Sequence, residues 1–390
     1  MVNMRAHENI AIYLLGLATF VTFLSANLIT PIIPVLAEKL GAQDLSIASV
    51  SGAYIILLAL FQIFTGALAD RFGKRKTIAL GAFLAALSSI LCVIALSWEQ
   101  MLILRGLGGV ADAIAGPALL ALVAELSGKQ KGKAMGIFRS SQGLAFIIGP
   151  TMGGTIAYFF SLHAPFFADF GLTIMGILIF LLLVPEAKRK RADLVNPLKS
   201  LKFIKQDLAL TKIAFLGFTE TFAFASLISF VPALALKFGM PEMEIATLFT
   251  AEAAVFTVTS LIAGMLSDRI GRKPIMLLGL LFSSVSLVSF FLVKEYWQFL
   301  LLMALFGFGS SSVYVMSSTM AADILPEENK AMLFGAFDAL IDLGMVVGPL
   351  LCFTFLAISG LSINHSFLLM AVPSIIALSI IWRIEETRNC

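Results

Sequence analysis

Seven ionisable residues lie inside long apolar stretches of the sequence. At the centre of a membrane such a group raises the free energy by about 2.5–3.5 kcal/mol or more. Each of them therefore needs an opposite charge, a bound proton or contact with water. Carboxylates in such positions suit a protein that binds and releases protons or cationic molecules. The seven residues are Arg105, Asp112, Arg139, Glu220, Glu252, Asp338 and Asp342.

The spacing of these residues groups some of them. Asp338 and Asp342 are four positions apart, so a helix places them on the same face. Two carboxylates this close resist simultaneous ionisation, which suits a group that exchanges a proton near neutral pH. Arg105 and Asp112 are seven positions apart and share a helical face as well. They are too distant for a direct bond in a regular helix, but they can line the same water-filled cavity.

Glu220 lies in the stretch Phe218-Thr219-Glu220-Thr221-Phe222. A carboxylate between hydroxyls and aromatic rings suits an organic cation, because ring faces add apolar area and cation–π contacts. Glu252 can contribute to the same chemistry, or it can be an interfacial residue that faces lipid headgroups. Asn27 is a polar candidate for the wall of a cavity. Three further acids are expected at the ends of spans: Glu125, Asp169 and Asp323.

The composition requires lipid as the solvent of this chain. Of its 390 residues, 59% are hydrophobic and 13% are charged, and the mean hydropathy is +0.98. A soluble domain carries about 25% charged residues. Three scattered histidines, and three cysteines without paired spacing, indicate neither a metal site nor a disulfide. The net charge of +3 is too small to indicate nucleic acid. Neither a nucleotide-binding loop nor the nucleophile–base arrangement of an enzyme emerges from the sequence.

The length of the apolar runs predicts an all-α membrane protein with about twelve transmembrane helices. A helical span needs about 20 apolar residues, and these runs are too long for strands and do not alternate. The first run, Ile10 to Leu36, lacks a clear cleavage site, so we expect it to remain as a span. The predicted spans are residues 10–37, 46–69, 77–97, 99–126, 134–160, 165–184, 209–238, 245–267, 274–293, 297–322, 331–359 and 366–383.

The second half of the chain repeats the first. A loop beginning GALADRFGKRK at Gly66 returns as GMLSDRIGRK at Gly264, each time between two apolar runs. Trp98 similarly has a counterpart in Trp297. A duplicated bundle of membrane helices is the architecture of a carrier. We therefore expect two pseudo-symmetric six-helix bundles, residues 1–184 and 208–390, joined by a basic linker at 185–207.

Lys and Arg indicate the orientation. With both termini in the cytoplasm, 22 of the 27 basic residues fall on the cytoplasmic side, and Arg105 and Arg139 lie within spans. Only Lys39, Lys237 and Lys294 fall on the opposite side. The linker continues after its basic residues 188–191 with Leu198, Leu201 and Ile204, spaced like one helix face. It is either an amphipathic helix on anionic headgroups or a solvated connector whose charge sets the topology.

These motifs resemble those of the major facilitator superfamily over the whole chain. Gly66-x-x-x-Asp70-Arg71-x-Gly73-x-Arg75 is similar to the loop between helices 2 and 3 of that family, and Asp268-Arg269 belongs to its echo. Arg105-x-x-x-Gly109 resembles the helix 4 motif associated with proton coupling. Helix 1 carries no acid, unlike several drug exporters of the family. The motif in helix 5 resembles that of antiporters and comprises Gly149, Pro150, Gly153 and Gly154.

The resemblance implies roles for the motif residues. Asp70, at the end of helix 2, can face the positive end of another helix, and the family loop is implicated in latching the two halves. The duplicate, Asp268, should face helix 5, where we expect it to pair with Arg139. Glycines let helices approach closely and proline bends a helix, which favours gating of a cavity. The corresponding gating residues in helix 11 are Gly348 and Pro349.

The resemblance implies a secondary transporter that exports hydrophobic or cationic small molecules in exchange for protons by alternating access. The alternative is a proton-coupled carrier of a sugar, organic acid or lipid, and a membrane sensor without transport is a remote third. No cofactor or metal is expected, because the proton gradient supplies the energy. The expected partners are a small-molecule substrate, protons and anionic lipid headgroups, but no nucleic acid. The protein is expected to act as a monomer in the plasma membrane.

Overall fold

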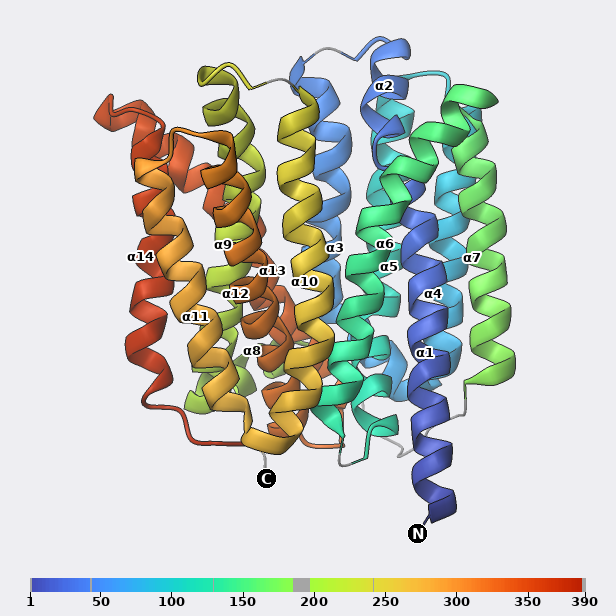
Figure 1. The fold of residues 1–390 in the computed structure, drawn as a ribbon. Coiled ribbons are helices and arrows are strands. Elements are labelled where there is room, and N and C mark those ends of the chain that lie inside the picture. Colours follow the sequence, from blue (N-terminus) through green and yellow to red (C-terminus); the bar gives the residue numbers. More distant parts are fainter. Residues whose placement is uncertain (1, 43, 129, 185–196, 241, 388–390) are drawn as a thin grey trace. The chain divides into compact units, whose positions relative to one another are not determined.

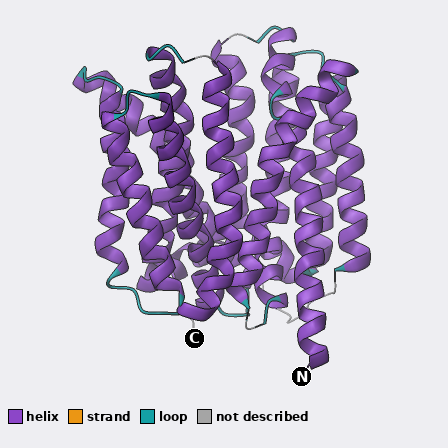
Figure 2. Cartoon of the chain, viewed as in Figure 1, coloured by secondary structure: helices purple, strands orange, loops and turns teal. Residues whose placement is uncertain are grey.

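The computed structural model describes residues 2–42, 44–128, 130–184, 197–240 and 242–387, and it contains only helices and loops there (Figure 1, Figure 2). Two short 3-10 turns, Cys92–Ile94 and Phe290–Leu292, follow α4 and α11. In chain order the helices are α1 (Val2–Leu28), α2 (Ile32–Lys39), α3 (Asp44–Phe72), α4 (Lys74–Leu91), α5 (Trp98–Leu126), α6 (Lys131–Phe159), α7 (Ala164–Leu183), α8 (Pro197–Gln206), α9 (Leu208–Lys237), α10 (Glu242–Ile270), α11 (Arg272–Ser289), α12 (Tyr296–Ile324), α13 (Lys330–Ser359) and α14 (Asn364–Ile381).

Each of the twelve predicted spans coincides with one of these helices or with a broken helix. Among the described residues, 10 helices are long and apolar enough to cross a membrane, or 11 if the bent pair within α3 forms one span. The helix α6, which contains Arg139 and Gln142, is not among them. The first predicted span, residues 10–37, lies within the candidate span Ile10–Lys39, and the helix is interrupted inside it. The helix stops at Leu28 and resumes at Ile32, because Pro31 lacks an N–H group and disfavours helical backbone before it.

The chain forms two compact units that each gather segments from distant parts of the sequence. Unit 1 comprises Met1–Lys129, Leu144–Lys202 and Leu325–Ala339. Unit 2 comprises Gln130–Gly143, Phe203–Ile324 and Leu340–Cys390. The start of α6 therefore belongs to unit 2 and the start of α13 to unit 1. The predicted bundles 1–184 and 208–390 differ from these units in those two segments.

Matching contacts within the two units reflect the duplication. In unit 1, the Ser88 hydroxyl donates to the carbonyl of Leu104 at 2.5 Å. In unit 2, the Ser286 hydroxyl donates to the carbonyl of Leu302 at 2.7 Å, and both residues lie 198 positions after their counterparts. Each bond ties the third predicted span of its half to the next helix, α4 to α5 and α11 to α12. The same helix pair is therefore built twice.

Glycines determine how closely the central helices approach. A Cβ at Gly109 of α5 would overlap the backbone carbonyl of Tyr54 in α3. In unit 2, a Cβ at Gly307 of α12 would be 2.5 Å from the backbone carbonyl of Glu252 in α10. Lipid gives no hydrophobic drive for helix association, so such close van der Waals contact is what holds membrane helices together. The glycine of the Arg105-x-x-x-Gly109 motif thus places Tyr54 beside α5.

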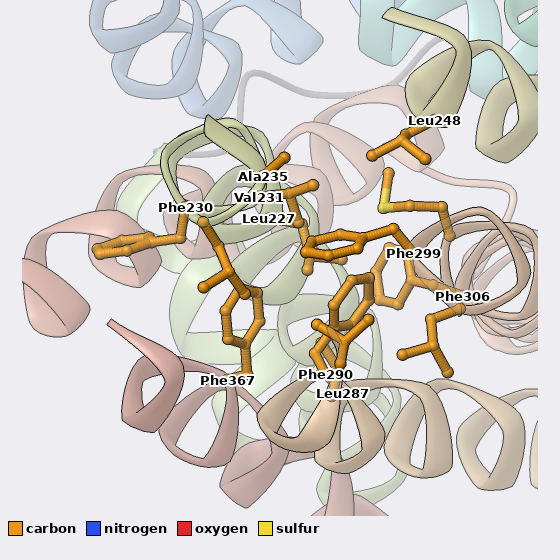
Figure 3. Packing of buried hydrophobic residues seen from close by; sticks show 14 of the residues in the cluster. Leu227, Phe230, Val231, Ala235, Leu248, Leu287, Phe290, Phe299, Phe306 and Phe367 are labelled. Carbon is orange, nitrogen blue, oxygen red and sulfur yellow. The ribbon is translucent and has the colours of Figure 1, made fainter. Parts of the chain in front are cut away.

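Unit 2 has a tightly packed apolar core, shown in Figure 3. Phe290 after α11 stacks on Phe367 of α14, with ring centroids 5.1 Å apart, and meets the edge of Phe299 in α12 at 6.0 Å. Aromatic pairs in these geometries contribute about 0.5–1.5 kcal/mol beyond their area. In the corresponding core of unit 1, Cys92 and Met101 stand where unit 2 has Phe290 and Phe299. The two units therefore share the arrangement of their helices but differ in the side chains of their cores.

The linker helix α8 carries the predicted amphipathic pattern. Ile204 is buried, whereas the basic side chains of Lys199, Lys202 and Lys205 are exposed. The amphipathic helix is thus confirmed for residues 197–206. The basic run at 188–191 lies outside the described residues. Contact of this helix with anionic headgroups stays a prediction.

We predict that Gly109→Ala destabilises the protein, because the added methyl group overlaps the Tyr54 carbonyl. Overpacking of this kind lowers the free energy of unfolding by about 1–3 kcal/mol. The measurement is the thermal unfolding midpoint of the purified protein in detergent. Gly116→Ala on the same helix is the matched control, since its Cβ meets no atom within 4 Å. Equal midpoints for the two variants would contradict the close-contact interpretation.

Candidate functional site

Asp268, near the end of α10, caps the beginning of α6. Its Oδ1 accepts the N–H of Gly132 at 3.0 Å, and its Oδ2 accepts the N–H of Lys133 at 2.8 Å. The first N–H groups of a helix have no partner within the helix and carry its positive end. Gly264 permits this approach, because a Cβ there would overlap the carbonyl of Gly132. Asp268 therefore faces α6, the fifth predicted span, as the family resemblance implies.

Asp70 makes the same contact in unit 1. Its Oδ1 and Oδ2 accept the N–H groups of Ala331 and Met332 at the start of α13, at 3.2 and 2.9 Å. A Cβ at Gly66 would overlap the carbonyl of Ala331, so this glycine again admits the helix. The motif residues Gly66 and Asp70 therefore act together. The glycine lets the backbone approach and the carboxylate binds it.

Basic residues of the repeated loops hold the neighbouring helix ends. Arg272 binds the carboxylate of Asp268 at 2.7 Å and that of Asp323, at the end of α12, at 3.2 Å. Lys131 also binds Asp323, at 3.3 Å. In unit 1, an ion pair joins Lys74 to Glu125 at the end of α5. Glu125 and Asp323 lie at helix ends as expected. Each binds a basic residue of the repeated loop in its own unit.

The remaining loop residues occupy the surface of the turn. Gly73 has φ +98°, a conformation that L side chains rarely adopt. Arg71 and Arg269 are exposed, and Arg75 is half-buried. Exposed guanidinium groups at a span end can reach headgroups, and this role of Arg71 and Arg269 stays a prediction.

The predicted Asp268–Arg139 pair is wrong. Arg139 is 5% exposed in unit 2, where its Nη2 donates to Ser318 Oγ at 2.9 Å and its Nη1 to Gln142 Oε1 at 3.0 Å. Its guanidinium lies 4.1 Å from the ring centroid of Tyr314. Asp268 instead takes the backbone N–H groups two turns earlier on α6, which are nearer the end of α10. Arg139 thus holds α6 to α12.

The glycine motif of α6 packs on α1 within unit 1. A Cβ at Gly149 would be 2.5 Å from the Cβ of Asn27, and one at Gly153 would overlap the carbonyl of Leu28. Pro150 lies inside α6 between these contacts. Gly154 differs, because a Cβ there meets no atom within 4 Å. Only two of the three motif glycines are therefore packing positions.

Asn27 lies under this contact. It is 6% exposed, and its Nδ2 donates to the carbonyl of Phe23 in its own helix at 2.8 Å. In unit 2, Gly348 of α13 approaches α9 in the same way, since a Cβ there would overlap the carbonyl of Phe222. Pro349 follows it inside α13. Both pairs, α6 with α1 and α13 with α9, thus place a proline beside a close glycine contact.

Arg105 and Asp112 of α5 are joined through Tyr54 of α3. The Tyr54 hydroxyl donates to Asp112 Oδ2 at 2.5 Å. The guanidinium of Arg105 lies 4.7 Å from the centroid of the Tyr54 ring. Sequence reasoning foresaw the shared face of Arg105 and Asp112 but missed Tyr54. A phenol within an apolar span needs a hydrogen-bond partner, and that requirement was the available signal.

Asp169 lies in the second turn of α7, near the span end as expected, but its side chain is buried inside unit 1. Its side chain is 4% exposed, and its Oδ1 accepts the hydroxyl of Thr173 at 3.2 Å. Thr173 in turn bonds the hydroxyl of Ser25 in α1 at 2.7 Å. Asp169 also acts electrostatically on Asp112 and is itself acted on by Arg105. Unit 1 therefore holds one guanidinium and two carboxylates together.

Glu220 of α9 is a buried acid of unit 2. Its side chain is 2% exposed, and Ser283 of α11 donates to its Oε2 at 3.0 Å. Its Oε1 has no hydrogen-bond partner in the described part of the chain. In the described part of the chain, the Ser283 hydroxyl is therefore the one hydrogen-bond partner of the Glu220 carboxylate.

Glu252 of α10 is also buried, with 5% exposure. Because the side chain is buried, it does not face lipid headgroups. Within the described residues its carboxylate accepts no hydrogen bond. Asp338 and Asp342 lie one turn apart on α13 and are both half-buried. The described residues contain no cluster of His, Cys, Asp and Glu that could hold a metal ion. The arrangement suits binding of protons or cations at single carboxylates.

Comparisons with known proteins agree with this geometry. Residues 15–233 and 213–389 both match the family model of the Major Facilitator Superfamily. Multidrug resistance protein 2 of Bacillus subtilis (strain 168) is 27% identical over 385 residues, which cover 95% of this chain and 94% of that protein. The class C tetracycline resistance protein of Escherichia coli is 27% identical over 380 residues, with 92% of each chain covered.

The fold has a solved counterpart. The crystal structure of the human organic anion transporter MFSD10 (TETRAN) superposes with a TM-score of 0.83 at 18% identity, and the match covers 96% of this chain and 99% of that one. At this identity the likeness concerns the fold alone. The two family matches together span nearly the whole sequence. The chain therefore belongs to the major facilitator superfamily, a family of membrane transporters rather than enzymes.

Proposed function

We propose that this transporter exports hydrophobic or cationic small molecules in exchange for protons. Its membership of the family supports transport across a membrane. Relatives that are resistance proteins for several drugs or for tetracycline support efflux as the direction. Alternating access then exposes the binding site first to one side and then to the other. The proposed location is the plasma membrane, with both termini in the cytoplasm.

The observation that carries the proposal is the environment of Glu220. Its carboxylate is buried, and one of its two oxygens lacks a partner within the described residues. A buried carboxylate without an opposite charge is unfavourable, and a proton or a cationic ligand removes that penalty. Proton and cation then compete for one carboxylate. Competition for one site is the simplest way to exchange a substrate for a proton.

The helix caps supply the proposed switch. Asp70 and Asp268 bind the N–H groups at the start of α13 and α6 only while those helix ends lie against α3 and α10. Hydrogen bonds to a charged group contribute about 1.5–3 kcal/mol each. Four such bonds strongly stabilise the conformation in which the starts of α6 and α13 lie against α10 and α3. We propose that they break and re-form during each transport cycle.

A second candidate substrate class is an organic acid, and Arg139 favours it. This guanidinium is buried, and its Nε has no hydrogen-bond partner in the described part of the chain. Its described hydrogen-bond acceptors, Ser318 and Gln142, are both neutral. A substrate carboxylate can supply the missing charge through a bidentate bond. A panel of matched cationic, neutral and anionic compounds distinguishes this candidate from the first.

We predict that Glu220→Gln abolishes substrate movement driven by a pH gradient but retains substrate counterflow. The amide keeps the size of the side chain and cannot bind a proton. Both fluxes are measured in proteoliposomes with the compound panel. Glu295→Gln, at an exposed position of the same unit, is the matched control and should behave like the unaltered protein. Undiminished gradient-driven movement in Glu220→Gln would contradict the proposal.

We predict that Asp268→Asn slows counterflow about tenfold or more, because its charge-assisted bonds are worth about 1.5–3 kcal/mol each. Charge reversal, Asp268→Lys, should be more severe, since a cation would face the positive end of α6. The readout is the initial counterflow rate at equal protein incorporation. Glu385→Gln is an exposed control in unit 2. If charge reversal left the rate unchanged, the switch could not involve this cap.

A further inference from the structure

Two neighbouring helices of unit 1, α3 and α5, each contain a place where the helix departs from regular geometry. The helix α3 is bent by 57° between its parts Gly52–Gln62 and Phe64–Phe72. The helix α5 contains the buried Pro117. Proline has no backbone N–H group, so it leaves the carbonyl of Ala113, four residues earlier, without its helical partner. Each helix therefore has a place at which it can bend.

Thr65 of α3 joins these two places. Its hydroxyl donates to the carbonyl of Ala113 at 2.5 Å and also to the carbonyl of Phe61 in its own helix, at 3.2 Å. The first bond supplies the donor that Pro117 withholds, and a buried carbonyl without a donor is unfavourable. The second is the bond to residue i−4 by which threonine bends a helix. One hydroxyl thus has an acceptor on each helix, and the bend of α3 and the proline of α5 lie at the same level.

The beginning of α13 covers both places. A Cβ at Gly335 would overlap the carbonyl of Gln62 and lie 3.1 Å from Cγ of Pro117. Four residues earlier in α13, the N–H group of Ala331 is bound by Asp70. The cap and the glycine therefore hold the same segment of α13 against α3 and α5. Release of the cap would uncover the bend and the proline together.

Unit 2 builds the same helix contact without these bending places. At Gly136, which corresponds to the glycine of α13, the three atoms nearest an added Cβ all belong to α10. By the 198-residue offset, Thr65 corresponds to Ala263. Pro117 corresponds to Val315. In the part of the chain that the structure describes, α10 and α12 each form one unbroken candidate span. Packing of a helix start on its neighbours therefore requires neither the threonine nor the proline.

We propose that unit 1 bends at a hinge during transport, whereas the same level of unit 2 stays rigid. The hinge comprises Gln62, Thr65, Pro117 and Gly335. The inference rests on the proposed alternating access and gives its two units different roles. Once the start of α13 leaves, the threonine hydroxyl turns to its own helix and water bonds the carbonyl that it releases. The ion pair of Lys74 with the end of α5 keeps the ends of α3 and α5 together as they move.

The test measures distances between two spin labels within each unit, by pulsed electron–electron double resonance of the purified protein in lipid. The three native cysteines are first replaced by alanine. In unit 1 the labels are attached to Phe72→Cys and Leu178→Cys, at exposed positions of α3 and α7. In unit 2 they are attached to the corresponding exposed positions of α10 and α14, Ile270→Cys and Ser379→Cys. The two pairs therefore report the same movement in the two repeats.

Breaking both helix caps, with Asp70→Ala and Asp268→Ala, should shift the distance distribution of unit 1 and leave that of unit 2 unchanged. Thr65→Ala with Pro117→Val copies the residues of unit 2 and should abolish the shift. An unchanged distribution in unit 1 overturns the proposal. So does a shift that persists in the copy, or an equal shift in unit 2.

The thermal unfolding midpoint tests the hinge with both caps intact. Thr65→Ala leaves the Ala113 carbonyl unpaired and should lower the midpoint. In the Pro117→Val background, which restores the missing N–H group, the same substitution should lower it much less. Thr77→Ala, at another buried threonine of unit 1, is the control, because Pro117→Val should not reduce its effect. An equal loss for Thr65→Ala in both backgrounds refutes the hinge. Neither measurement involves Glu220, so the hinge can fail while Glu220→Gln still abolishes gradient-driven movement, and the reverse result would leave the hinge intact.

Discussion

A charge held away from water must find a compensating group, and the polar architecture of this protein follows from that constraint. Asp70 and Asp268 find the free N–H groups at the start of another helix. Arg139 finds the face of an aromatic ring and two neutral oxygens. Among the described residues, Glu220 finds a serine hydroxyl as its one hydrogen-bond partner. Groups that are fully compensated hold helices together, and groups that are not are the ones available for ligands.

The duplicated frame makes this division visible. Equivalent helices approach through equivalent glycines, Gly109 in one unit and Gly307 in the other. The residue beneath the first is Tyr54 and beneath the second Glu252, 198 positions later. One repeat therefore uses this place for a neutral hydrogen-bond donor and the other for an acid. Since the backbone packing is shared, the difference concerns chemistry rather than folding.

Local features of the sequence were enough to predict the helices and their repeats. The apolar runs are long, so the spans follow from them. The position of Asp268 opposite the fifth predicted span, α6, follows from the resemblance of the repeated loop to the family motif. The break at Pro31 was missed because the apolar character continues across it. The partner of Arg139 and the burial of Asp169 were missed for another reason. They depend on the rotation of each helix about its axis, which low amphipathicity in an apolar helix leaves undetermined.

The make-up of the two units constrains how the chain is synthesised. Unit 1 includes residues 325–339, which the ribosome adds long after the rest of that unit. Domains that fold during synthesis normally complete from the N-terminus onward. Here the hydrogen bonds of the Asp70 carboxylate can form only after Ala331 and Met332 have been translated. Until then the early helices form an incomplete unit in which the Asp70 carboxylate lacks these two N–H partners. Membrane chaperones and proteases would encounter the unit in that form.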